Sequence, residues 1–469
     1  MADANRTSLR YIQEVTNGVT PANPAFQAIG FTSSSMTLNV DTEADDTIVP
    51  DRQVLDVPVL GFEVSGDVSA RLRFSALDDF FQASLGGTWA NTPRLTYTAT
   101  SATAITVASG GAAFLAGHLI RLTGSPLNNG AVRRVVSSTA TAITTTSLTV
   151  ESAVSGQVRV VGIEGASADI AALASPPRLT TIALNFVNLG FVAGQWIKIA
   201  EGANGFATLA NNTWVRIASV SATTLTLDST PTGWTADAGT GRTIRILTGD
   251  YVRNGIVRRS FSVEREVVRA DEVSTYRVFR GVEFDLSFDL AARSNVQVAF
   301  EAMGLNAANY STTRTTGATT LAAVEGEIYN ASSNIGQIRI NNADFLTAIT
   351  SLSIEMTNNM RGREAIANTG YASLGQGRFE LTGTLEAYFG DASLVNAIQN
   401  NTPLSISAPM LANDKASGYH LDIPRVKFTE GGDEVSGVDS DIIPSLGFQG
   451  LKHPTLGYTF QLSRYSYLE

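Results

Sequence analysis

The sequence predicts an all-β protein with a few short helices. Glycine is abundant (41 residues), charged residues are scarce (16%), and no long helical heptads occur. Strand-like alternation of apolar and polar residues recurs along the chain. In residues 61–89, "GFEVSGDVSARLRFSALDDFFQASLGGTW", every second residue from Phe62 to Phe74 is apolar or glycine. This stretch therefore predicts one long strand with one apolar face and one polar face.

A short helix is expected directly after this strand, because the period of the pattern changes there. Five residues fall on one side of such a helix: Leu77, Phe80, Phe81, Ser84 and Leu85. Ser75 is placed to cap it, and Asp78 and Asp79 suit its positive end. Gly86 is expected to end it.

The strand and its helix occur twice. "GRFELTGTLEAYFGDASLVNAI" (377–398) repeats the alternation without a gap, and "SLSIEMT" (351–357) matches "SMTLNVD" (35–41). Each short strand is followed by a polar loop and then the long strand, so the chain contains a duplicated unit. Two more stretches between the copies, 281–290 and 295–303, predict a hairpin. Their equivalents in the second copy are 421–429, 441–450 and 457–465.

Residues 95–248 differ in composition and hold another repeat. "AFLAGHLIRLTG" (113–124) corresponds to "GFVAGQWIKIAEG" (190–202), which predicts two small β modules inserted into the first unit. An insertion is tolerated at an exposed loop tip, so the block is expected to project outward and to be dispensable. The expected parts are a first unit in two segments (1–94 and 249–310), two modules (95–170 and 171–248) and a second unit (311–469).

Features of enzymes, membrane proteins and metal proteins are missing from the sequence. It has no cysteine, no apolar stretch of membrane-spanning length and no apolar export signal. His118, His420 and His453 stand in no catalytic motif, so we expect no enzyme and no cofactor. Two acidic loops do not match the calcium-loop pattern, so no metal is expected either. These loops contain Asp41, Glu43, Asp45 and Asp46, and Glu430, Asp433, Glu434, Asp439 and Asp441.

A duplicated two-faced sheet without an active site suits a subunit of a polymer. Strands that join side by side between subunits would close into a large barrel and lose their edges. The polar face would then line a channel. The net charge of −10 makes tight binding of nucleic acid unfavourable, although the protein could still surround it.

Several stretches resemble the tail tube proteins of long-tailed bacteriophages. They are "RYIQEVTNGVTP" (10–21), "PDRQVLDVPVLGFEVSGDVSARL" (50–72), "FFQASLGGTW" (80–89), "RRSFSVEREVVRADEVSTYRVFRGVEFDLSFDL" (258–290), "GTLEAYFGDASLVNAIQNNTPLSI" (383–406) and "LDIPRVKFTEGGDEVSG" (421–437). The resemblance covers residues 10–94 and 250–465. The modules between them are similar in style to immunoglobulin-like decorations.

The resemblance implies a structural virion protein with two tandem tail-tube β-sandwich domains. It implies stacked rings of six such domains, hence three chains per ring, with six chains as the alternative. The tube would be the conduit for DNA ejection, and the DNA would pass without specific binding. The implied partners are other copies of the chain, the tape measure protein, and the tail terminator and distal tail proteins. The implied location is the virion tail, assembled in the host bacterial cytoplasm without a membrane. A decorated tube surface argues against a contractile sheath and so for a siphophage.

Two sets of residues are candidates for roles in such a tube. The first set would line the lumen, where an acidic wall repels phosphates; it consists of Glu63, Asp67, Glu283, Asp285, Asp289, Glu380 and Glu386. Some of these faces could instead point outside the tube or into subunit contacts. The second set lies in the long loops 41–60 and 357–375, which are expected to join one ring to the next; it consists of Asp45, Asp46, Asp51, Arg52, Arg361 and Arg363.

Two other functions remain open at this point. The modules could bind the host surface, with the duplicated unit only as a base. Their aromatic residues could line a sugar site, although core packing is the expected use; these residues are Phe114, Phe191, Trp196, Trp214 and Trp234. A glycan hydrolase ranks lowest, because the adjacent carboxylates Asp78 and Asp79 diverge on a helix and cannot flank one bond.

Overall fold

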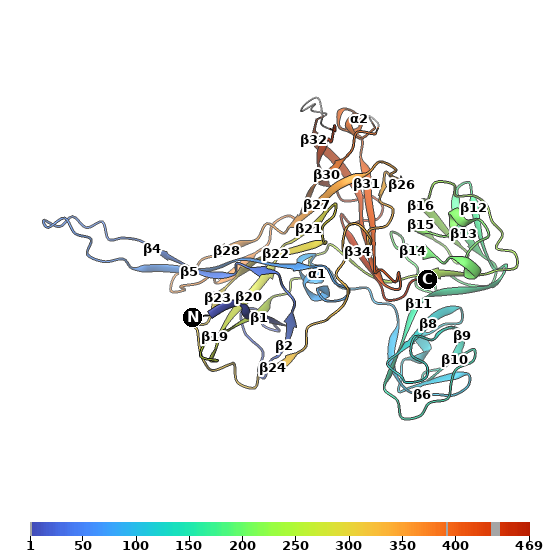
Figure 1. The fold of residues 1–469 in the computed structure, drawn as a ribbon, viewed down its shortest axis with the longest axis horizontal. Coiled ribbons are helices and arrows are strands. Elements are labelled where there is room, and N and C mark those ends of the chain that lie inside the picture. Colours follow the sequence, from blue (N-terminus) through green and yellow to red (C-terminus); the bar gives the residue numbers. More distant parts are fainter. Residues whose placement is uncertain (1, 391–392, 433–440) are drawn as a thin grey trace.

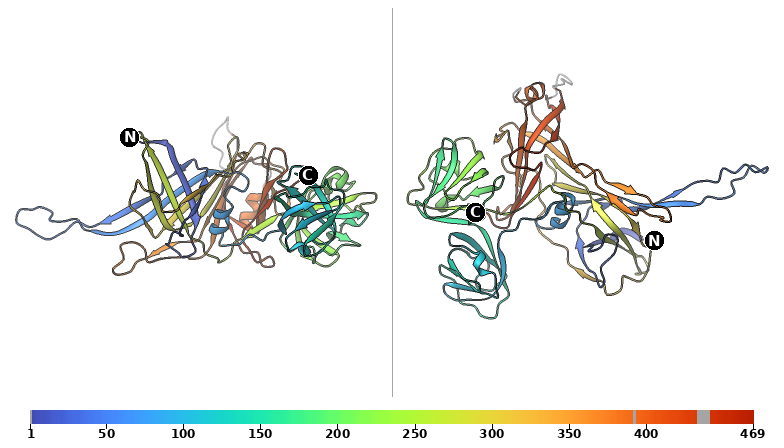
Figure 2. Two further views of the ribbon diagram at one scale, coloured as in Figure 1. Left: turned by 90° about the horizontal axis from the view of Figure 1, so that it is seen from below. Right: turned by 180° about the vertical axis from the view of Figure 1, so that it is seen from behind.

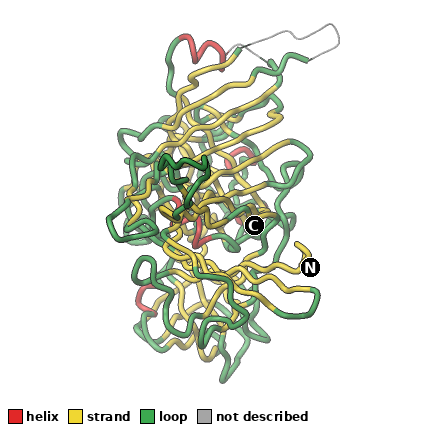
Figure 3. The backbone as a smooth tube through the Cα atoms, turned by 90° about the vertical axis from the view of Figure 1, so that its left-hand side faces the viewer, coloured by secondary structure: helices red, strands yellow, loops and turns green. Residues whose placement is uncertain are grey.

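Strands make up nearly all of the regular secondary structure, as expected. The computed structural model describes residues 2–390, 393–432 and 441–469. About 49% of the chain is strand and 5% is helix, so the all-β prediction is confirmed. Strands dominate the view along the long axis in Figure 3. Of the acidic-loop residues named above, Asp433, Glu434 and Asp439 lie outside the described residues.

One long sheet runs through both copies of the duplicated unit. In the first unit its strands lie in the order β4 (Thr37–Thr42), β5 (Val59–Arg71), β22 (Gln297–Gly304) and β21 (Leu286–Ala291). In the second unit the order is β27 (Ile349–Thr357), β30 (Glu380–Ala387), β33 (Ser445–Gly450) and β32 (Gly418–Gly431). The two units therefore repeat the same four-strand pattern.

A second layer of strands repeats as well. In the first unit β19 (Phe261–Arg269) pairs with β20 (Ser274–Phe284), and in the second unit β31 (Leu404–Leu411) pairs with β32. Both pairs contain an irregularity at the same place, between Phe261 and Val263 and between Leu404 and Ile406. A matching irregularity fixes the residue-by-residue equivalence of the two units, and it makes Phe284 the counterpart of Phe428.

The remaining strands of these layers include one long strand, β1, which lies between β19 and β2, and several shorter ones. They are β1 (Ala2–Gln13), β2 (Ala25–Ile29), β3 (Ser33–Ser34), β18 (Asp250–Arg253), β23 (Asn306–Ala307), β24 (Thr319–Leu321), β25 (Arg339–Ile340), β26 (Ala343–Asp344), β28 (Arg361–Arg363), β29 (Ser373–Gly375) and β34 (Gln461–Tyr465).

Gly66 and Gly383 occupy equivalent positions in the long strands, and both are required by close approach of a neighbouring strand. A Cβ on Gly66 would lie 2.7 Å from the backbone of Met36, and one on Gly383 would lie 2.4 Å from the carbonyl oxygen of Ser353. The facing strands are therefore shifted by two residues relative to the sequence match of 35–41 with 351–357. A shift of two keeps every side chain on the same face.

The helices differ from each other in their surroundings. α1 (Asp78–Ser84) is buried through Phe80 and Phe81, whose rings contact Phe284, Phe300 and Tyr11. Ser75 does not cap it: the helix begins after Leu77, and the Ser75 hydroxyl donates to Asp78 Oδ2 at 2.8 Å. Gly86 follows the helix with φ +56°, as its role at the end of a helix requires. α2 (Ser393–Gln399) is the counterpart in the second unit.

The inserted block forms a separate sheet with two apolar cores. The first core is enclosed by β6 (Arg94–Thr100), β7 (Ala104–Val107), β8 (His118–Thr123), β9 (Val132–Ser138), β10 (Ala142–Thr145) and the start of β11 (Gly156–Ser167). The second is enclosed by the end of β11, β12 (Ile170–Ala174), β13 (Pro177–Thr181), β14 (Trp196–Ile199), β15 (Trp214–Val220), β16 (Thr224–Ser229) and β17 (Thr243–Leu247). β11 pairs with β8 and with β17, so it runs through both modules.

The molecule is elongated, with the two modules at one end and an arm at the other (Figures 1 and 2). The arm is the hairpin of β4 and β5 with its connection 43–58, and it projects far beyond the rest of the chain. The C-terminal residues lie beside the modules.

Candidate assembly surfaces and the module joint

Strands β21 and β27 join the two units into one sheet. They pair antiparallel over six residues, from Leu286 opposite Met356 to Ala291 opposite Ser351. On one face of this pair lie the buried residues Phe288 and Ile354. The last strand of the first unit's sheet thus adds to the first strand of the second unit's sheet, and the backbone donors of both edges are satisfied.

The opposite face of the long sheet is polar and rich in carboxylates. Asp289 is exposed on β21, and Glu63, Asp67, Glu380 and Glu386 are partly exposed on β5 and β30. Glu301 and Glu355 share this face, opposite Asp67 and Ser287, although neither was among the candidates. The alternation of 295–303 and 351–357 contained the signal for both. A groove of about 440 Å³ on this face is lined by Asp67, Asp285, Glu301 and Glu355 among others.

Glu283 and Asp285 do not follow the alternation expected for 281–290. The strand is interrupted at Asp285, where β20 leaves the second layer and β21 enters the long sheet. Glu283 (3% exposed) pairs with Arg258 at 2.5 Å, and Asp285 (7% exposed) accepts hydrogen bonds from the Asn358 backbone and side-chain nitrogens, both at 2.8 Å. Burial raises the pKa of both carboxyls, with these partners acting in the opposite direction. The two groups are buried, whereas the other lumen candidates are partly or fully exposed.

The arm carries the ring-stacking candidates of the loop 41–60. Backbone hydrogen bonds from Glu43 to Pro58 (3.2 Å) and from Asp45 to Asp56 (2.9 Å) keep it a hairpin. Asp45, Asp46, Asp51 and Arg52 lie toward its tip, where Ile48 is 97% exposed. An apolar side chain in full contact with water far from any core is typical of a surface that a partner covers.

The loop 357–375, with Arg361 and Arg363, has a different position. It forms the hairpin of β28 and β29, and it bends onto the base of the arm. The Phe62 N–H donates to the Thr369 carbonyl at 2.6 Å, and Gln376 donates to Glu283 at 3.0 Å. A groove of about 750 Å³ lies between this hairpin and the arm. The loops 41–60 and 357–375 hold equivalent places in the two units, yet they differ in their contacts.

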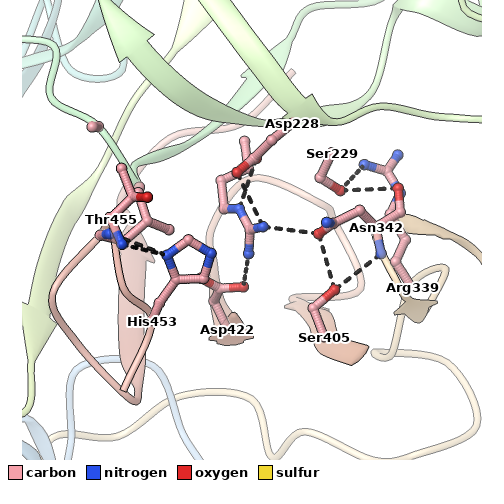
Figure 4. Close-up of polar contacts among 12 residues, drawn as sticks. Asp228, Ser229, Arg339, Asn342, Ser405, Asp422, His453 and Thr455 are labelled. Carbon is pink, nitrogen blue, oxygen red and sulfur yellow. Dashed lines mark hydrogen bonds and ion pairs between the residues drawn. The ribbon is translucent and has the colours of Figure 1, made fainter. Parts of the chain in front are cut away.

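The second module is fixed to the second unit by a buried joint (Figure 4). Arg216 of β15 is 1% exposed, and it donates to Asp228 (2.9 Å) in its own module and to Asp422 (3.0 Å) on β32. It also donates to Asn342 at 2.8 Å, and Asn342 in turn contacts Ser405. Burial lowers the pKa of Arg216, but the two carboxylates offset it, so the pKa lies above its ordinary value.

Aromatic rings and a second arginine complete this joint. His420 stacks on Trp196 with ring centroids 4.1 Å apart and also contacts Trp214. Arg339 of the second unit donates to the Trp214 carbonyl at 2.7 Å. Burial, with Arg339 and Arg216 nearby, holds the pKa of His420 well below its ordinary value. A neutral histidine between aromatic rings serves packing, which disfavours a catalytic role for it.

The other aromatic and histidine candidates also have structural surroundings. Phe114 and Phe191 are buried in the module cores, and Trp234 packs at the edge of the second core. His118 accepts a hydrogen bond from the Leu115 backbone at 3.0 Å, and His453 accepts one from Leu456 at 3.1 Å. Trp196 and Trp214 belong to the joint rather than to a module core. No open aromatic surface for a sugar is formed by these five aromatic residues.

The residues that flank the inserted block lie side by side. Thr92 donates its backbone N–H to Asp250 at 2.8 Å, and Ala90 pairs with Tyr251. Asp250 is buried and also binds Arg464 of the second unit (2.9 Å) and Arg159 of the first module. The two ends of the block therefore lie together, and the block is held by buried contacts on both sides. Such contacts argue against a block that can be removed without effect on stability.

Within residues 2–390, 393–432 and 441–469, no group of three or more His, Cys, Asp or Glu side chains is arranged to hold a metal ion. No helix in the same residues is long and apolar enough to cross a membrane.

Comparison with known proteins identifies the family. A family model described as phage tail tube protein matches residues 4–450, nearly the whole chain. No curated protein sequence matches the chain. The match spans both units and the modules between them, and it agrees with the duplicated two-layer sheets. The chain belongs to the phage tail tube protein family.

Proposed function

We propose that the chain is the structural subunit of a tail tube in which three chains form each ring. The observation that supports this proposal is the β21–β27 joint, which connects two equivalent units inside one chain. A ring continues the same order from chain to chain. In the described residues β4 pairs along its length only with β5, so its other edge is available for the neighbouring chain.

The other end of the long sheet is the continuation of β32. Phe428, Glu430 and Gly431 pair with β33 on one side, and the residues that follow, 433–440, lie outside the described residues. Since Phe428 is the counterpart of Phe284, Glu430 and Gly431 occupy the place where β21 begins in the first unit. In the proposed ring the outer edge of these two residues faces β4 of the next chain, as the outer edge of β21 faces β27.

The polar face of the long sheet lines the lumen in this proposal, and DNA passes along it during ejection. The carboxylates Glu63, Asp67, Asp289, Glu380 and Glu386, together with Glu301 and Glu355, supply negative charge that repels phosphates. Glu283 and Asp285 support the wall from within rather than facing DNA. The role is structural and not catalytic, and it requires no cofactor.

Ring stacking and the outer surface follow from the same arrangement. The tip of the arm, with Asp45, Asp46, Asp51 and Arg52, reaches the next ring, and Arg361 and Arg363 lie beside its base. The modules, 95–170 and 171–248, decorate the outside, while 1–94 with 249–310 and 311–469 form the two tube domains. A siphophage tail assembled in the host cytoplasm fits this, with the tape measure protein in the lumen and terminator and distal tail proteins at the ends.

Native mass spectrometry and electron microscopy of the assembled full-length protein test the proposal. Rings of three chains, stacked into tubes with six similar lobes per ring, are the expected result. Rings of six chains would overturn the threefold arrangement and keep the tube. Discrete particles that never form rings but bind host cells would overturn the tube and favour a decoration protein.

A further inference from the structure

The two units differ in charge at equivalent places, and in the first unit these places lie where a hairpin docks. In the first unit the hairpin 358–376 rests on four positions. Thr369 approaches Gly61 and Phe62, Tyr371 binds Glu63, Gln376 binds Glu283, and Gly370 approaches Leu305 and Asn306. These contacts show what one unit offers to the long hairpin of the unit that follows it.

Each of these positions has a counterpart in the second unit. The equivalences follow from the strand pairings, in which Glu283 faces Met303 as Lys427 faces Gln449, and Gly66 corresponds to Gly383. The residues that correspond to Gly61, Glu63, Glu283 and Asn306 are Arg378, Glu380, Lys427 and Lys452. Glu380 keeps the negative charge of Glu63, whereas the other three counterparts are basic. We call Arg378, Lys427 and Lys452, with the neighbouring Arg425, the basic end of the second unit.

The basic end is accessible in the chain. The Arg378 side chain is 77% exposed beside Glu380, and Lys452 is exposed. Arg425 and Lys427 are partly exposed, and neither forms an ion pair with another described residue. All four residues lie at one end of the sheet, since Leu451 binds the Arg425 carbonyl at 2.8 Å and Lys427 pairs with Gln449.

The two long hairpins also differ in charge: the hairpin 358–376 has more basic than acidic residues, and the arm has more acidic than basic ones. The hairpin that docks on Glu63 and Glu283 carries Arg361 and Arg363 against one carboxylate, Glu364. The arm carries six carboxylates against one guanidinium, Arg52; the carboxylates are Asp41, Glu43, Asp45, Asp46, Asp51 and Asp56. The arm is the hairpin of the first unit, and in the described residues it projects away from the units instead of resting on one as the hairpin 358–376 does.

We propose that the base of the arm docks on the basic end of the second unit of the neighbouring chain in the same ring. This inference rests on the proposed ring and names its contact surface. Asp41, Glu43 and Asp56 then face Arg378, Lys427 and Lys452, while the arm tip continues toward the next ring. Glu63 and Glu283 of the first unit disfavour an arm docked there, because carboxylates would meet, so units alternate around the ring.

Charge reversal tests the contact. The variant Lys427→Glu/Lys452→Glu is compared with Arg71→Glu/Arg293→Glu, which makes the same charge change on exposed arginines at the opposite end of the sheet. Ring formation by the full-length chain is followed by analytical ultracentrifugation at low and high salt. The first variant is expected to need at least about tenfold more protein for half-assembly at low salt, because like charges would meet at every contact. The second variant is expected to assemble like the parent.

The rescue variant adds Asp41→Lys/Glu43→Lys to Lys427→Glu/Lys452→Glu, and it is expected to restore assembly. If Lys427→Glu/Lys452→Glu assembles like the parent, or if the arm substitutions do not restore a lost assembly, the docking contact is wrong while the tube stands. If the parent chain itself forms no rings under any salt condition, the proposed function fails and this contact fails with it.

Discussion

The two units have the same strand order, but their helices have different neighbours. Leu72, beside α1, is fully buried, because Val296 and Tyr329 bind its backbone and cover it. Its counterpart beside α2, Phe389, is 42% exposed. α1 is also held by the second unit, whose Tyr419 donates to Asp78 at 2.7 Å. Since Tyr329 and Tyr419 come from later parts of the chain, the first unit is completed by the second.

The helix of the second unit is not covered in this way within the described residues. Phe389, Tyr388, Leu346 and Ile443 are all exposed around α2. Apolar side chains gathered on one surface of a folded unit are typical of a contact with another molecule. The difference between the units therefore indicates which surfaces the neighbouring chain covers, and the predictions below test that comparison in order of decreasing effect.

Breaking the joint between the units has the largest expected effect. Ile354→Asp places an unpaired carboxylate opposite Phe288 in the shared core, which should destabilise the chain by on the order of 4 kcal/mol or more. Ser353→Thr, on the polar face of the same strand, should change stability by less than about 0.5 kcal/mol. Denaturant unfolding followed by circular dichroism compares the two. Equal effects would show that this strand pair does not hold the units together.

The module joint comes second. Asp422→Ala leaves the buried Arg216 without its partner on the second unit, and the expected loss is about 3–5 kcal/mol. The double variant Arg216→Met/Asp422→Leu should recover much of this loss, because an apolar pair of similar size replaces the ions. Thermal unfolding and limited proteolysis between module and tube domain report both. A double variant as unstable as Asp422→Ala would assign the loss to packing rather than to the isolated charge.

Disrupting the outer edge of β4 should affect assembly more than folding. The pairing of Ser35 with Asp67 places the N–H groups of even-numbered β4 residues on the outer edge. Leu38→Pro thus removes an outward donor and keeps the β4–β5 ladder. The variant should remain folded and form no closed rings, whereas Leu38→Ile should form them. Tubes of normal appearance from Leu38→Pro would exclude this edge from the ring contact.

The polar face should affect transport and not assembly. Asp289→Lys/Glu301→Lys/Glu355→Lys places positive charge where the proposal places passing DNA. Weak phosphate contacts then accumulate, so ejection should slow, most of all at low salt. Single-particle ejection kinetics of assembled phage provide the measurement. Unchanged kinetics in infectious particles would place this face away from the conduit.

The smallest expected effect is on the pH dependence of the stability of the chain. The pKa of Glu301 is raised from 4.5 by partial burial and by Asp285, Glu355 and Asp67. The folded chain therefore holds this proton more tightly than the unfolded chain does, and stability falls as pH rises through the raised pKa. Glu301→Gln should flatten that fall. Melting temperatures of the parent and of Glu301→Gln, measured across the acidic pH range, test this prediction. Parallel curves would show that Glu301 does not cause the fall in stability.

The sequence was sufficient for the periodic parts of the fold. The alternation of 62–74 and 377–389 predicted both long strands, and the all-β class is confirmed. It was not sufficient where side chains meet over long distances. The interruption at Asp285 depends on Asn358, and the joint at Arg216 depends on Asp422, so neither pattern is visible locally. The basic residues of the second unit can be read from the sequence. Their equivalence to residues of the first unit could be recognised only from the strand pairings, which make Lys427 the counterpart of Glu283.

The β21–β27 joint also bears on how readily a tube can form. Every free body that enters a complex loses translational and rotational freedom, an association penalty of several kcal/mol. In the proposed ring half of the contacts between units are made inside chains, where the partner is always present at high effective concentration. Fewer independent bodies then have to be captured for each layer of the tube. Duplication followed by fusion thus makes polymer growth less dependent on how much subunit the infected cell holds.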